Sequence, residues 1–87
     1  MPEISRFFGI VITMYADDHA PPHFHARYGE YEALIGIDDG EIIRGAMSKC
    51  ALRLIQEWTE LHRQELLNNF KESQKDMPEF KKINPLD

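Results

Sequence analysis

The chain has 87 residues, of which 43% are hydrophobic and 29% charged, and these values fit a single globular domain over residues 1–87. The apolar content excludes a disordered tail, and the longest apolar run, Phe7–Ile12, is far too short to cross a membrane. The formal charge of −5 arises in residues 1–47, which hold three basic and eight acidic groups, whereas residues 48–87 hold seven of each. This balance argues against a general nucleic-acid binder, which normally carries a basic stripe.

The chain carries one cysteine, Cys50, which cannot form an internal disulfide. Unpaired thiols persist in reducing compartments, and the N-terminus lacks the basic, apolar and small-residue succession of a secretion signal. We therefore expect a cytoplasmic protein.

The first predicted element is a strand over residues 4–15, because this segment is rich in β-branched and aromatic residues. Its nearly continuous apolar character favours a central position in a sheet. A loop over residues 16–22 follows, where two consecutive prolines remove two backbone donors and end the pairing.

The next predicted element is a hairpin over residues 23–37 that turns at Gly29–Glu30. Glycine in the first turn position is the requirement of a type II′ turn. Because strand side chains alternate between faces, one face carries residues suited to a core, namely Phe24, Ala26, Tyr28, Tyr31, Ala33, Ile35 and Ile37. The opposite face carries His23, His25, Arg27, Glu32, Leu34 and Gly36.

A second turn at Asp39–Gly40, of the type I′ kind, leads into a short strand over residues 41–44. Ser48 suits the N-cap of a helix over about 49–75, whose apolar residues recur at helical spacing and predict one side packed on a sheet. The tail, residues 76–87, is expected to lie over the surface, anchored by Phe80, Ile83 and Leu86. The predicted fold is α+β: a small antiparallel four-strand meander, one long helix packed on the sheet and an extended C-terminal tail.

Three of the four histidines lie close together in the sequence, beside other titratable groups. In a strand, His23 and His25 point the same way, with Cβ atoms roughly 6–7 Å apart. Arg27 continues this row, and Glu32 stands opposite Arg27 across the hairpin. Gly36, opposite His23, is expected to leave space above the strand in which a small ligand could sit.

These residues support three alternatives. The first is a metal site, in which His19, His23 and His25 supply nitrogen ligands to zinc; no other cofactor is indicated. The second is metal-free cleavage of a phosphodiester by a small endoribonuclease, with the two strand histidines as base and acid, Arg27 stabilising negative charge and Glu32 on the same face. The third is a solvated outer face, in which Arg27 and Glu32 form a cross-strand pair. The sequence leaves open whether the protein is an enzyme.

Residues 21–31 read Pro-Pro-His-Phe-His-Ala-Arg-Tyr-Gly-Glu-Tyr, a specific string, and further features are Glu57–Trp58, the run from Leu61 to Leu66, and Ile83–Asn84–Pro85–Leu86. Through them the chain resembles the small bacterial proteins grouped as "domain of unknown function 4160". The resemblance covers nearly the whole chain. It makes His23, His25 and Arg27 stronger candidates for functional residues, because they lie in the string that is most specific to the family.

The resemblance implies no reaction. It implies a toxin–antitoxin-type or regulatory component that acts by binding a small partner protein. The partner it suggests is a small protein of another family, domain of unknown function 2442, whose gene often lies beside genes of the first family.

Overall fold

The computed structural model describes residues 3–15, 21–75, 77 and 79–86. The described chain forms an antiparallel five-stranded sheet in the order β1-β2-β3-β4-β5, followed by two helices. Its elements are β1 (Glu3–Phe7), β2 (Ile10–Thr13), β3 (His23–Tyr28), β4 (Tyr31–Gly36), β5 (Ile42–Ala46), α1 (Lys49–Leu61) and α2 (Arg63–Glu72). The α+β class and the meander are as predicted, whereas four strands and one helix are wrong in number.

The fifth strand arises because the predicted strand 4–15 is a hairpin. The chain turns at Phe8 and Gly9, with φ of 48° and 80°, and Phe7 then pairs with Ile10. Turns with two positive φ angles favour Asn and Gly, and a phenylalanine in the first position gives no turn signal. The turn therefore could not be recognised within the apolar run of the sequence.

The β3–β4 hairpin has the predicted register, with Tyr28 opposite Tyr31 and His23 opposite Gly36. The prediction that this face of the hairpin packs into the core is confirmed at Phe24, which is fully buried. It is wrong for the two tyrosines, which are 38% and 45% exposed. They lie on the correct face, but at the turn end of the hairpin, where less of the chain covers them.

The β4–β5 connection is longer than the predicted two-residue turn. Residues 37–41 separate the strands, Gly40 N donates to Gly36 O, and Glu41 N donates to Asp39 Oδ1 at 2.9 Å. Among the described non-glycine residues Phe8 alone has a positive φ, so Asp39 does not adopt a type I′ conformation. Strand β5 is therefore Ile42–Ala46, whereas the predicted strand was 41–44. Its register with β4 is irregular at Leu34/Ile35.

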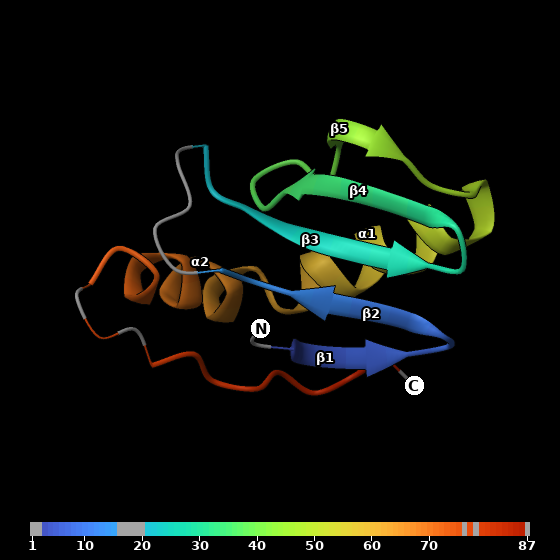
Figure 1. The fold of residues 1–87 in the computed structure, drawn as a ribbon. Coiled ribbons are helices and arrows are strands. Elements are labelled where there is room, and N and C mark those ends of the chain that lie inside the picture. Colours follow the sequence, from blue (N-terminus) through green and yellow to red (C-terminus); the bar gives the residue numbers. More distant parts are fainter. Residues whose placement is uncertain (1–2, 16–20, 76, 78, 87) are drawn as a thin grey trace.

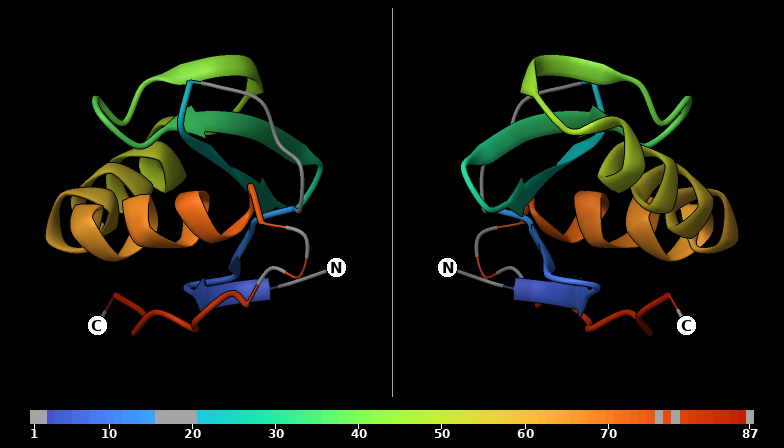
Figure 2. Two further views of the ribbon diagram at one scale, coloured as in Figure 1. Left: turned by 90° about the vertical axis from the view of Figure 1, so that its left-hand side faces the viewer. Right: turned by 90° about the vertical axis from the view of Figure 1, so that its right-hand side faces the viewer.

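The predicted helix begins as expected, because Ala51 N donates to Ser48 Oγ at 3.1 Å. It is interrupted at His62, whose φ of −121° is not helical. Arg63 at the start of α2 donates from Nε to the Ile37 carbonyl at 2.9 Å, a tertiary contact that fixes α2 against the β4–β5 loop. Both helices lie on the same side of the sheet, and α2 extends past the end where β2 ends and β3 begins (Figures 1 and 2).

The core lies between the sheet and α1, around the fully buried Trp58. The Trp58 ring lies 5.2 Å from Phe7 and 5.7 Å from Phe24, centroid to centroid. The described part of the tail packs as predicted: Ile83 is buried, and Phe80 and Leu86 pack against the core. No helix within the described residues is long and apolar enough to cross a membrane.

The tail is held beside β1 by hydrogen bonds from three elements. Asn69 of α2 binds both backbone groups of Lys81, Trp58 Nε1 donates to Asn84 O at 2.8 Å, and Ile83 N donates to Ile4 O at 2.8 Å. The tail runs along the outer edge of β1 (Figure 1). This edge of the sheet is therefore covered by the chain itself.

Candidate functional site

The face of the sheet turned away from α1 holds the predicted site residues. The strand register aligns Thr13, His25, Leu34 and Arg44 in one row across four strands. In the neighbouring row the same four strands, β2 to β5, contribute Val11, Arg27, Glu32 and Ala46. We call these two rows, together with His23, the outer face.

His23 is largely buried, at 8% exposure. Its Nδ1 lies 2.8 Å from the Pro21 carbonyl, which can only accept, so Nδ1 carries the proton. Its ring packs against Phe70 of α2 at 5.8 Å, because α2 reaches past this end of the sheet. These contacts give His23 a clear role in joining the start of β3 to α2.

His25 is half-buried and lies 5.6 Å from His23, ring centroid to ring centroid, so the predicted pair is adjacent. The Tyr15 ring meets His25 edge-on at 4.4 Å. Tyr15 was not predicted as part of this cluster, because the sequence did not give the register between the predicted strand 4–15 and the strand that carries His25; in the structure it lies two residues beyond Thr13, the last residue of β2.

Arg27 and Glu32 are opposite each other, as predicted, and both are exposed. Among the described residues, however, neither forms an ion pair, so the register is confirmed without the predicted salt bridge. At the β1 edge, Arg6 binds Glu3 at 2.8 Å, and this hydrogen bond lowers the pKa of Glu3 from its ordinary 4.5.

Arg44 of β5 also lies on this face, although the predicted turn at Asp39–Gly40 did not place it there. The irregular register at Leu34/Ile35 sets Arg44 opposite Leu34, on the outer face. Leu34, Glu32, His25 and Arg44 line an open depression of about 420 Å³. No ion pair involving Arg44 occurs within the described chain.

The space predicted above Gly36 does not exist. A Cβ built on Gly36 would lie 2.8 Å from Asp39 Oδ1 and 3.6 Å from Ile43 Cδ1. The loop before β5 therefore fills this position, and the depression lies further along the hairpin.

The predicted zinc site remains a prediction. His19 lies outside the described residues, and His23 and His25 are adjacent. Within residues 3–15, 21–75, 77 and 79–86, no three His, Cys, Asp or Glu side chains are grouped closely enough to hold a metal ion.

A second surface, at the turn end of the sheet, carries three exposed aromatic side chains. Phe8 is 57% exposed in the β1–β2 turn, and Tyr28 and Tyr31 flank the β3–β4 turn. A Cβ built on Gly9 would lie 3.5 Å from the Tyr28 ring, so the two turns are neighbours. Both turns lie at the same end of the sheet (Figure 1), and we call this surface the aromatic end.

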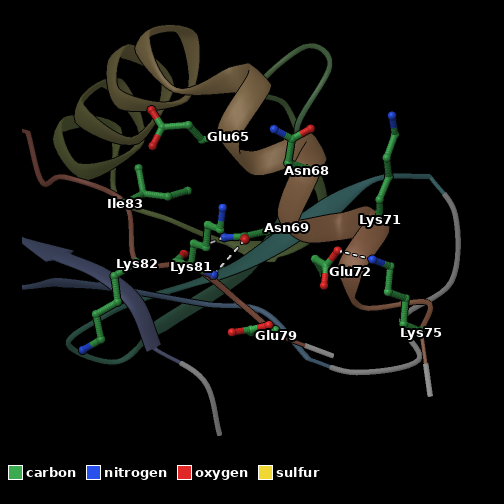
Figure 3. Close-up of a pocket in the computed structure, with 10 residues that line it drawn as sticks. All are labelled: Glu65, Asn68, Asn69, Lys71, Glu72, Lys75, Glu79, Lys81, Lys82 and Ile83. Atoms are coloured by element: carbon green, nitrogen blue, oxygen red, sulfur yellow. Dashed lines mark hydrogen bonds and ion pairs between the residues drawn. The ribbon is translucent and has the colours of Figure 1, made fainter. Parts of the chain in front are cut away.

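A hollow of about 590 Å³ lies between α2 and the tail (Figure 3). Its lining includes four lysines and three glutamates, and Lys75 binds Glu72 at 2.6 Å. This hydrogen bond lowers the pKa of Glu72. The Lys71 and Lys82 side chains point in different directions, so their charges do not converge on one ligand position.

Comparison with known proteins gives one match. No curated protein and no solved structure matches the chain. A family model matches residues 9–71, which include β2 to β5, α1 and nearly all of α2. The chain therefore belongs to the family described as Domain of unknown function (DUF4160).

Proposed function

We propose that this protein acts by binding a small partner protein through its aromatic end, as one component of a toxin–antitoxin-type or regulatory pair. The observation that carries the proposal is Phe8. A bulky residue at φ of 48° costs roughly 1–2 kcal/mol of folding free energy, and this side chain is 57% exposed. Since Asn or Gly would suit the turn better, the benefit of Phe8 lies outside folding.

The neighbours of Phe8 strengthen this reasoning. Tyr28 and Tyr31 supply further apolar area with a polar tip, and aromatic residues are enriched at the energetic centres of protein interfaces. Phe8 lies in one hairpin turn, and the two tyrosines are the strand residues that flank the other, so little conformational entropy is lost when the three side chains bind. The acidic excess of residues 1–47 favours a partner with a basic face.

The test is co-expression with a small protein of the domain-of-unknown-function-2442 kind from the same genome, followed by co-purification and calorimetric titration. We expect Phe8→Asn to weaken binding by at least about tenfold, because it removes an interface centre. The same variant should unfold at equal or higher denaturant concentration, since Asn tolerates positive φ. This combination separates loss of binding from loss of folding.

The matched control is Leu61→Asn, which removes another exposed apolar side chain, at 65% exposure, from the C-terminal end of α1. It should leave the affinity unchanged within about twofold. Equal binding by wild type and Phe8→Asn would overturn the proposal, as would a complex that forms without contact at the two turns.

A further inference from the structure

The outer face holds two arginines that the aromatic end does not use. Within the described chain neither Arg27 nor Arg44 is ion-paired, although both are exposed on the same face. An exposed arginine is ordinarily solvated, so exposure alone indicates little. What distinguishes these two is their place on the face: Arg44 lines the depression of about 420 Å³, and Arg27 lines a small adjoining pocket that shares His25 and Glu32 with it.

The register gives the spacing of the groups. Arg44 lies two strands from His25 in the same row, which corresponds to Cα atoms about 10 Å apart. Arg27 lies two residues along β3 from His25, about 6–7 Å away. The two guanidinium groups, on side chains this long, can therefore reach toward one position above the row that contains Leu34.

The floor of the depression consists of paired strands. Its residues belong to β4 and β5, whose backbones approach so closely that a Cβ on Gly45 would overlap the Glu32 carbonyl oxygen. His25, at its rim, is held edge-on against Tyr15 at 4.4 Å. Groups carried on paired strands keep their positions better than groups on loops, and this reduces the cost of binding.

We propose that the outer face is a binding site for a nucleotide-type ligand, with Arg27 and Arg44 holding a phosphate group. Guanidinium groups match phosphate oxygens in charge and geometry. Glu32 lines the same depression and would repel a bare anion, but it can accept hydrogen bonds from ribose hydroxyl or base amino groups. Leu34, half-buried between these groups, offers an apolar contact to the base or sugar.

The mixture of groups defines this ligand class. Two cations without a carboxylate would suit any phosphate, and a carboxylate alone would suit a cation. Two arginines, one carboxylate, one imidazole and an apolar floor fit a ligand that joins a phosphate to hydrogen-bond donors and a flat apolar ring. The site is separate from the aromatic end, so the two proposals can fail independently.

The experiment is a nuclear magnetic resonance titration of the full ¹⁵N-labelled chain with three probes: inorganic phosphate, a ribonucleoside monophosphate and a short single-stranded RNA. We expect the backbone amide signals of residues 25–27, 32–34 and 43–45 to shift in a saturable way. The monophosphate should bind at least about fivefold more tightly than inorganic phosphate, because only the nucleotide can also use Glu32 and Leu34. If the RNA binds more tightly than the monophosphate, the natural ligand is a polynucleotide. If the two bind equally, the natural ligand is a free nucleotide.

The variants are Arg27→Gln and Arg44→Gln, with Arg53→Gln as the matched control. Arg53 is an exposed arginine of α1, on the other side of the sheet, and its loss changes the net charge equally. We expect each outer-face variant to weaken monophosphate binding by about tenfold and the control by less than twofold.

Three outcomes would overturn the proposal. The first is the absence of saturable shifts with any probe. The second is an equal loss of affinity in the control variant, which would indicate non-specific charge attraction. The third is a set of shifts confined to the lysine-lined hollow beside α2, which would place the phosphate elsewhere.

Discussion

Gly45 is the residue that sets the geometry of β5. Its φ is 90°, and a Cβ there would overlap Glu32 O and lie 3.0 Å from Ala33 Cα, both in the backbone of β4. No side-chain rotation can relieve such a contact. The close approach of the two strands, and with it the position of Arg44 on the outer face, therefore requires glycine at this residue.

Gly29 provides the comparison, since it also has a positive φ, of 58°, but nothing lies within 4 Å of its built Cβ. We expect Gly29→Ala to lower the free energy of unfolding by about 1 kcal/mol, the cost of the left-handed backbone alone. Gly45→Ala adds displacement of a neighbouring strand and should cost about 3 kcal/mol or more. Urea denaturation measures both, and equal losses would show that β5 can move away from β4 at little cost.

At the scale of elements, the hairpin of β3 and β4 was predictable because its signals are local. Alternating polar and apolar residues fix the faces, and Gly29 marks the turn. The β1–β2 turn was not predictable, because Phe8 lacks any turn preference. The break at His62 was not predictable either, since the apolar period continues through it and tertiary contacts such as that from Arg63 to Ile37 O lie outside the local sequence.

The same distinction applies to the candidate site. The sequence placed His23, His25, Arg27 and Glu32 on one face, because alternation and register determine a face. It did not indicate that His23 is buried, since this depends on Phe70 in a distant helix. Inclusion of Arg44 depends on an irregularity between two strands, for which the sequence carries no signal.

The contact between α2 and the tail supports a prediction at this scale. The buried Asn69 amide donates to Lys81 O at 2.8 Å and accepts from Lys81 N at 3.0 Å. Asn69→Ala removes both hydrogen bonds and should lower the free energy of unfolding by about 1–3 kcal/mol. Hydrogen exchange should accelerate at residues 81–84, while the amides of β3 and β4 change only by the global loss.

Asn68→Ala is the matched control, because Asn68 is exposed and, among the described residues, its side chain accepts a hydrogen bond only from the exposed Gln64. It should change stability by less than about 0.5 kcal/mol and leave exchange in the tail unaltered. Equal exchange rates in the tail of the two variants would mean that Ile83 and Trp58 hold the tail without help from Asn69.

For the whole molecule, the two edges of the sheet differ. The tail covers β1, whereas β5 is an edge strand with four exposed residues and an irregular register. Strand irregularity discourages pairing with other chains, and a covering segment achieves the same protection by occupying the edge. In this molecule each edge is thus protected in a different way, and the protection of β1 can be removed by a single change.

Deletion of residues 79–87 should uncover the β1 edge, including the Ile4 carbonyl that now accepts from Ile83 N. We expect the shortened chain to self-associate with rising concentration, because β1 carries apolar residues and would present unpaired backbone groups. Light scattering coupled to size exclusion measures this. Trp58 emission should also shift to the red, since its indole nitrogen would exchange the Asn84 carbonyl for water. The control is Ile83→Ala in the full chain, which keeps the edge covered and should remain in the wild-type association state. If the shortened chain also remained in the wild-type association state, the tail would contribute packing but no protection of the edge.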